Sequence, residues 1–211
     1  MKKQKMKLTR QKLKIAENEI SLNDKVMAKC IQQLGPLKPQ EQRDPFDAII
    51  VSIINQQISQ AAAATIVGRV SDITKRPFNV KNILSAKNED LRKSGMSQRK
   101  VDYAKGIADN VKRNIIPMDN FPYMDDQEII DILVKTPGIG QWTAEMFLMF
   151  ALDRPDVVST GDAGLRRAAK NIYGNKIKGT DQEIMQKCSE KWRPWRTVGC
   201  RYLWLSLGNK K

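Results

Sequence analysis

The segment Lys135-Thr-Pro-Gly-Ile-Gly-Gln-Trp-Thr143 joins two helical patterns through a very short turn, and it decides the fold. Gly138 and Gly140 permit a turn that is too tight for residues with side chains. The next helix is expected to begin near Gln141, and the first N–H groups of a helix have no acceptor inside it. Because the helix dipole also favours an anion there, the segment predicts a hairpin that binds phosphate groups.

The same hairpin has a simpler interpretation as a corner between two helices, since such corners often contain glycine. The order of the flanking residues favours phosphate binding. A helical pattern precedes Pro137-Gly138-Ile139-Gly140, Thr143-Ala144 follows it, and the segment 142–152 is apolar nearly all round. That apolar pattern predicts a buried helix. Ile139 is expected to anchor the turn by pointing into the core.

Outward from the hairpin, the chain has the pattern of one helix after another. Asp44-Pro45 pairs an N-cap with a first-turn proline, and Ser59 precedes an alanine-rich helical segment. Helices are expected over residues 21–35, 44–54, 60–73, 97–113, 126–135, 142–152, 162–173 and 194–207. No sustained alternation of apolar and polar residues indicates a strand, so the predicted fold class is all-α.

The charge of the chain points to an anionic partner. Lys and Arg number 37 against 23 Asp and Glu, a formal net charge of +14. Nucleic acid is the leading partner for such a chain, and an anionic membrane surface is the alternative. No apolar run approaches the roughly 20 residues of a membrane span. No apolar stretch follows the basic N-terminus as in a signal peptide, so we expect an intracellular protein.

The residue types limit the chemistry. The sequence has no His, and its three cysteines, Cys30, Cys188 and Cys200, are far apart. Zinc sites built on His, catalysis by Ser-His or Cys-His pairs, and an iron–sulfur cluster are therefore excluded. Acid–base chemistry must come from carboxylates, Lys, Tyr or water.

Asp162 is the candidate carboxylate. Taken in isolation, it is an N-cap for the helix that follows it, because Asp is favoured at that position. The functional interpretation depends on the hairpin, since Asp162 follows the predicted buried helix by a short loop. On a nucleic acid, a carboxylate suits cleavage of a glycosidic bond, because it stabilises the positive charge that develops on the sugar. It can also orient or deprotonate the attacking water.

Four stretches in order make the chain resemble a known family. They are Asp44-Pro-Phe-Asp-Ala48 with Ile54-Asn-Gln-Gln-Ile-Ser59, Ser94-Gly-Met-Ser-Gln-Arg-Lys100, Thr136-Pro-Gly-Ile-Gly-Gln-Trp-Thr-Ala144 with Gly161-Asp162, and Glu190-Lys-Trp-Arg-Pro-Trp-Arg196 followed by Tyr202-Leu-Trp204. Together they resemble the helix-hairpin-helix superfamily of base-excision DNA glycosylases, in particular its 3-methyladenine DNA glycosylase II branch. The likeness runs from about Asp44 to Leu207.

The resemblance implies two helical lobes with a base-binding cleft between them and double-stranded DNA carrying damaged bases as the partner. We expect a basic arm over residues 1–14, a terminal lobe over 15–43 and 156–211, and a central lobe over 44–155. We also expect a monomer. The target nucleotide would be flipped out of the duplex, because the bond is unreachable inside the stack. Asp162 would then be the essential carboxylate.

The resemblance also implies roles for the residues that match the family. A base pocket is expected from Trp142, Trp204, Met146 and Gln56, where a ring face attracts a cationic alkylated base. The alternative is that Trp142 and Trp204 are core aromatics. Trp192 and Trp195 are expected to be core aromatics instead. Gln57 is expected to insert into the gap left by the flipped base, although a solvent-exposed turn is the alternative. The expected backbone-contacting residues are Gly138, Ile139, Gly140, Gln141 and Thr143.

Trp142 narrows the expected reaction. Family members that also cut the DNA strand have a Lys nucleophile at this position, and Trp cannot form a Schiff base. The resemblance therefore implies excision of alkylated purines that leaves an abasic site, without lyase activity. Deaminated or mismatched bases, and a DNA-binding module without catalysis, are the alternatives. No cofactor is expected to be required, but backbone carbonyls of Val134, Thr136 and Ile139 are candidate ligands for a sodium or potassium ion.

Overall fold

The computed structural model describes residues 7–41 and 43–208. Over those residues it has twelve α-helices and two short 3-10 helices, and no strand. The predicted all-α class is therefore confirmed. None of the helices within the described ranges combines the length and the apolar character that crossing a membrane requires.

The described residues divide into two compact units, which are treated one at a time below. The first unit, unit 1, takes in residues 43–147, and the second, unit 2, takes in residues 7–41 and 148–208. The division follows Phe147, inside a helix, rather than residue 155 as expected. A sequence pattern identifies a helix as one element, whereas its two ends can pack with different parts of the chain.

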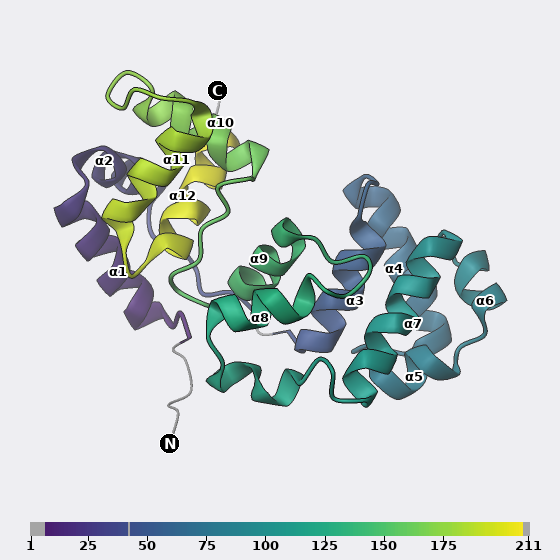
Figure 1. Cartoon of the computed structure of the whole chain (residues 1–211). Coiled ribbons are helices and arrows are strands. Elements are labelled where there is room, and N and C mark those ends of the chain that lie inside the picture. The colour runs from purple at the N-terminus through teal and green to yellow at the C-terminus, as the bar shows by residue number, and fades with distance from the viewer. Residues whose placement is uncertain (1–6, 42, 209–211) are drawn as a thin grey trace. The chain divides into compact units, whose positions relative to one another are not determined.

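Unit 1 carries the hairpin on a set of packed helices (Figure 1). Its helical elements are α3 (Pro45–Asn55), α4 (Gln60–Thr74), α5 (Val80–Ser85), α6 (Asn88–Lys93), α7 (Gln98–Lys112), η1 (Met118–Tyr123), α8 (Asp126–Leu133) and most of α9 (Gln141–Phe150). Helix α7 packs against α3, α5 and α6. It is therefore a central support of this unit.

Local capping explains where three of these helices begin. Asp44 accepts the N–H of Asp47, Ser59 accepts that of Ala62, and Ser97 accepts that of Lys100. A side-chain oxygen at the N-cap satisfies a donor that the helix itself cannot. The predicted starts of α3, α4 and α7 are confirmed.

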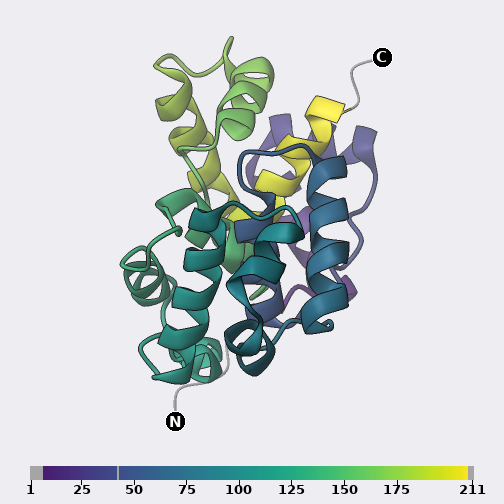
Figure 2. The same cartoon turned by 90° about the vertical axis from the view of Figure 1, so that its right-hand side faces the viewer.

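Unit 2 combines the beginning and the end of the chain. Its elements are α1 (Arg10–Asn23), α2 (Lys25–Leu34), α10 (Ala163–Tyr173), α11 (Asp181–Ser189), η2 (Glu190–Trp192) and α12 (Arg196–Gly208). Helix α12 packs against α1, α2, α10 and α11, and Figure 2 shows it in yellow beside the purple N-terminal helices. The terminal segments thus build one core.

The start of the chain differs from the expectation. Residues 1–6 of the expected basic arm lie outside the described residues, but Arg10 already begins α1, and Leu13 is buried. Ser21 lies inside α1 instead of opening a helix, and Asp24 caps α2 by accepting the N–H groups of Val26 and Met27. Apolar positions four residues apart, such as Ala16 and Ile20, give α1 a buried face that the many basic residues obscure in the sequence.

Candidate functional site

The hairpin of unit 1 is closed by hydrogen bonds of its own backbone. After α8, Thr136 N–H donates to Leu133 O at 2.9 Å, and Ile139 N–H donates to Thr136 O at 3.1 Å. Ala144 N–H then donates to Gly140 O, which makes Gln141 the first residue of α9. The predicted tight turn between two helices is present, and α9 starts at its exit.

The side chains of the hairpin separate into an inner and an outer set. Ile139 is 4% exposed and Thr143 is 6% exposed, whereas Gly140 and Gln141 are exposed. The predicted anchoring of the turn by Ile139 is confirmed. The backbone of these exposed residues forms the N-terminus of α9, and a helix N-terminus favours an anion.

Gly138 is required by both conformation and packing. Its φ is +92°, in the region that favours glycine. A Cβ at this position would lie 2.5 Å from Cδ2 of Tyr103 on α7. The hairpin backbone therefore packs directly on the Tyr103 ring, and a side chain at position 138 would force the two apart.

The turn between α3 and α4 lies in the same unit. Gln57 is exposed and has a φ of +58°, an uncommon conformation for a residue with a side chain. The side chain of Gln56 points to the hairpin instead, because its Nε2 donates to Gly138 O at 2.8 Å. This bond uses only one N–H of the Gln56 amide, so it is compatible with a role in the base pocket. That role stays a prediction.

Helix α9 presents two of the expected base-pocket residues. Trp142 is 49% exposed, and Met146 is half-buried one turn later on the same helix. Phe150, two turns after Trp142, is 40% exposed. The predicted buried helix is confirmed for one face, which includes Ala144, Phe147 and Leu148, but Trp142 and Phe150 are exposed. An apolar pattern does not distinguish core residues from exposed apolar surface.

Asp162 is the N-cap of α10 in unit 2. Its Oδ1 accepts the N–H of Leu165 at 2.7 Å and the indole Nε1–H of Trp204 at 3.2 Å. The Trp204 ring packs against Phe150, with 5.6 Å between the ring centroids. The carboxylate is thus held from two directions, by its own helix and by an indole whose ring is itself packed.

Gly164 makes room for this arrangement. A Cβ on Gly164 would lie 3.1 Å from Asp162 Oδ1 and 3.4 Å from Trp204 Nε1. Neither Gly164 nor Phe150 was expected from the sequence to belong to the site. The only local signal was the position of Gly164 two residues after the predicted cap.

The structure therefore assembles the expected residues into two groups. Unit 1 holds Gln56, Gln57, the hairpin, Trp142 and Met146, and unit 2 holds Asp162 and Trp204. Trp192 and Trp195 are buried, at 0% and 6% exposure, which confirms them as core residues.

The cation expected at the hairpin stays a prediction. Val134, Thr136 and Ile139 belong to one short segment, and the bond from Ile139 N–H to Thr136 O closes it. A carbonyl oxygen has two lone pairs, so that bond leaves Thr136 O able to bind an ion. Among the described residues, no group of three or more His, Cys, Asp or Glu side chains offers another metal site.

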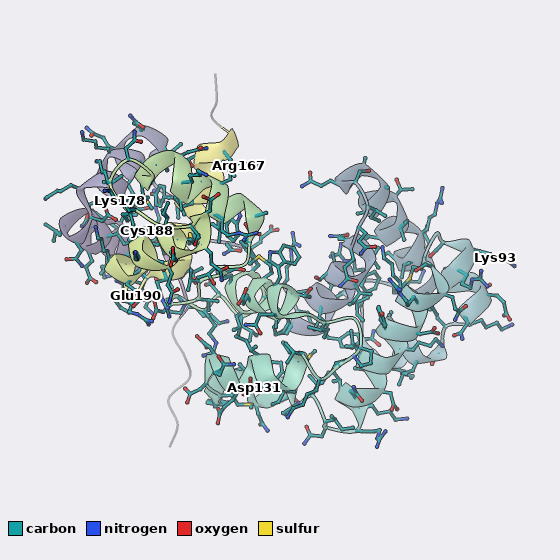
Figure 3. All side chains as sticks on the ribbon, turned by 45° about the horizontal axis from the view of Figure 1, so that its top comes forward. Lys93, Asp131, Arg167, Lys178, Cys188 and Glu190 are labelled. Carbon is teal, nitrogen blue, oxygen red and sulfur yellow. The ribbon has the colours of Figure 1, made fainter. Side chains whose placement is uncertain are left out.

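The cysteines are unsuited to catalysis. All three are buried thiols, and burial raises the pKa of Cys188 to about 12. Burial also raises the pKa of Cys30 and Cys200. A thiol with a raised pKa carries little of the reactive thiolate at neutral pH. Figure 3 shows Cys188 among the helices of unit 2.

Comparison with known proteins defines the family. Residues 50–194 match the model of the HhH-GPD superfamily base excision DNA repair proteins. The chain belongs to this superfamily.

Three proteins illustrate the likeness. The alkylbase DNA glycosidase-like protein mag2 of Schizosaccharomyces pombe is 29% identical over 90% of this chain and 92% of its own. The crystal structure of a DNA-3-methyladenine glycosidase from Bacillus halodurans has a TM-score of 0.85 at 33% identity, covering 92% of this chain and 89% of that one. The S. pombe 3-methyladenine DNA glycosylase Mag1 in complex with abasic DNA has a TM-score of 0.79 at 29% identity, covering 92% and 97%.

Proposed function

We propose that this protein is a monofunctional DNA N-glycosylase that flips alkylated purines out of double-stranded DNA and excises them, leaving an abasic site. The names of its relatives support this activity, since they include 3-methyladenine DNA glycosylases of a bacterium and a yeast. The abasic DNA bound to the yeast relative corresponds to the product of such a reaction.

The hairpin supplies the grip on the DNA backbone. Gly140 and Gln141 expose the N-terminus of α9, whose N–H groups favour a phosphate. A net charge of +14 adds sequence-independent attraction. Exposed basic residues of unit 2, such as Arg167 on α10 and Lys178 in the following loop, contribute to that charge (Figure 3).

The observation that carries the chemical proposal is the fixed carboxylate of Asp162. When the bond between C1′ and the base nitrogen breaks, the bonding electrons leave with the base and the sugar becomes positively charged. A carboxylate held by Leu165 N–H and Trp204 Nε1–H stabilises that charge without reorganising. Water then adds to C1′, and Asp162 orients it or accepts its proton.

The aromatic residues favour an alkylated purine as the leaving base. An alkylated ring nitrogen makes the purine cationic, and a tryptophan face attracts such a cation by about 0.5–2 kcal/mol. Trp142 offers an exposed ring, and Met146 lies beside it on α9. A cationic base also leaves as a neutral molecule, so the chemistry needs only the one carboxylate.

The reaction stops at the abasic site because the position after the hairpin carries Trp142. Strand cleavage by this family's route needs an amine there to attack C1′ and form a Schiff base. Indole nitrogen is a hydrogen-bond donor only. Release of the nucleobase should therefore yield DNA whose strand breaks only on later treatment with alkali or heat.

Asp162→Asn tests the proposal. Asn keeps the capping of α10, since Asn and Asp are comparable N-caps, but it removes the negative charge. We expect the release of methylated bases to fall by roughly a hundredfold or more, as when a preorganised electrostatic group is lost. Mass analysis of bases released from methylated DNA measures this, and thermal unfolding and DNA affinity close to those of the wild type serve as controls.

Three results would contradict the proposal in whole or in part. If the wild-type protein released no base from methylated DNA while binding it, the chain would be a DNA-binding module. If it released uracil or hypoxanthine in preference to alkylated purines, the class would stand but the substrate would change. An Asp162→Asn variant that kept most of its activity would remove Asp162 from its role.

A further inference from the structure

Helix α7 contacts the two parts of unit 1 that are expected to bind DNA, which are the hairpin and the turn that carries Gln57. Lys100, in the first turn of α7, donates from Nζ to Ile54 O at 2.7 Å and to Gln56 O at 2.8 Å. These carbonyls are the end of α3 and the start of the turn that carries Gln57. One ammonium group thus caps α3 and holds the turn, and a cation is favourable at a helix C-terminus.

The same face of α7 also supports the hairpin. Tyr103 follows Lys100 by three residues, which places both side chains on one face of the helix. Its ring comes within 2.5 Å of the position that a Cβ of Gly138 would take, so the hairpin backbone packs directly on it. Lys100 and Tyr103 therefore support two segments that are more than eighty residues apart in the chain.

Gln56 completes the connection. Its backbone carbonyl is bound by Lys100, and its side-chain Nε2 donates to Gly138 O at 2.8 Å. The adjacent Gln57 has a left-handed backbone conformation, which persists only where the surroundings hold it. The bonds on both sides of Gln56 supply that restraint.

We propose that the turn at residues 55–57 and the hairpin at 137–140 form a single DNA-binding surface that is held in place by α7. Lys100 and Gln56 are its positioning residues. The hairpin alone binds phosphates. Insertion of Gln57 beside the target nucleotide requires the turn to stay at a set distance from the bound backbone. Without the contacts of Lys100 and Gln56, the hairpin still binds phosphate groups. Each insertion of Gln57 must then also order the turn, which costs conformational entropy. This inference rests on the proposed function.

Lys105 provides a matched control on the same helix. Its Nζ donates to Leu84 O at 3.1 Å and to Ala86 O at 2.6 Å, at the end of α5. Lys105 thus makes the same kind of bonds as Lys100 but to a segment with no assigned contact to DNA. Lys100→Met and Lys105→Met lose equivalent interactions, so they separate positioning from general stability.

The test uses a duplex with an abasic-site analogue, flanked by the fluorescent base 2-aminopurine to report insertion of the turn. For Lys100→Met we expect weaker binding to this duplex and a smaller fluorescence change, while affinity for undamaged DNA is retained. The single-turnover rate of base release should fall by roughly tenfold to a hundredfold, as a misplacement of about 1 Å produces. Lys105→Met should match the wild type in all of these.

Two further variants sharpen the result. Lys100→Arg keeps a cationic donor and should recover part of the fluorescence change. Gln56→Ala should weaken abasic-site binding, and adding it to Lys100→Met should cost less than the sum, because both loosen the same joint. The inference is overturned if Lys100→Met binds the abasic duplex as the wild type does, or if Lys105→Met loses as much. The binding experiments involve no catalysis, so a wild type without activity would refute the proposed function and leave this test intact.

Discussion

At the scale of single residues, the position of the Asp162 carboxylate depends on Gly164, which has no side chain, as well as on two hydrogen-bond donors. Asp162 is held by Leu165 N–H and the Trp204 indole, and Gly164 leaves the space in which they meet. A carboxylate that is fixed before the reaction stabilises the transition state without further reorganisation. The same carboxylate is an N-cap, and capping is compatible with the catalytic role proposed for it.

Gly164→Ala should therefore reduce activity without reducing stability. Its Cβ would approach Asp162 Oδ1 to 3.1 Å, which requires the carboxylate or the indole to move by a few tenths of an ångström. We expect base release to fall roughly tenfold, which corresponds to about 1.4 kcal/mol in the barrier. Single-turnover kinetics measure the rate.

Gly106→Ala is the control for this prediction. A Cβ on Gly106, in α7, would meet nothing within 4 Å. Both substitutions gain up to about 1 kcal/mol from helix propensity. Equal rates for the two variants would show that the space beside Asp162 is not required.

At the scale of elements, the start of α3 is fixed by a charge pair as well as by its cap. Asp47, in the first turn, accepts hydrogen bonds from Nε and Nη2 of Arg76 at 2.9 and 2.8 Å and from the N–H of Phe78 at 3.0 Å. Burial raises the pKa of this carboxyl, but the hydrogen bonds from Arg76 and Phe78 and the charges of Arg76 and Arg43 outweigh it, so the pKa lies below its ordinary value. The pair joins α3 to the segment between α4 and α5.

This pair predicts a dependence of stability on pH. Because the folded-state pKa of Asp47 is lowered, its contribution to stability is complete above the unfolded-state pKa of about 4 and is lost as the pH falls through the folded-state pKa. Asp47→Asn should therefore lower the urea midpoint at pH 6, and its difference from the wild type should shrink toward pH 2. A difference that stayed constant over this range would contradict the assignment.

At the scale of the whole molecule, unit 2 is built from segments at the two ends of the chain. Asp24 connects them, because its Oδ2 accepts Tyr173 OH at 2.7 Å and Trp192 Nε1–H at 3.1 Å while its Oδ1 caps α2. Burial and the bond to Asp24 also raise the pKa of Tyr173, so its hydroxyl stays protonated as a donor. A second such contact joins Glu17 to Tyr202 OH at 2.7 Å.

Asp24→Ala should lower the free energy of unfolding by about 3–5 kcal/mol, from one lost cap and two buried donors left without an acceptor. Asp44→Ala loses only a cap, so it should cost about 1 kcal/mol. Chemical denaturation followed by tryptophan fluorescence compares them. Equal losses would mean that the contacts to Tyr173 and Trp192 contribute nothing.

Helix boundaries show why local patterns predict part of the fold well. The caps at Asp44, Ser59, Ser97 and Asp162 depend on residues three positions away, so their chemistry is visible in the sequence. Helix α11 was not expected, although Thr180 and Glu183 form a capping box that indicates its start. Helix α1 was missed because basic residues surround its apolar positions.

The hairpin, the all-α class and the candidate carboxylate follow from the order of residues alone, because a tight glycine turn and a helix cap involve neighbours in the chain. The partners of those residues do not follow from it. Gln56 meets Gly138 across 82 residues, Trp204 meets Asp162 across 42, and Trp192 meets Asp24 across 168. Hydrogen bonds over such separations exist only once the helices have packed, since packing brings the donor and the acceptor together. The tertiary structure therefore decides how firmly the turn, the hairpin and the carboxylate are held.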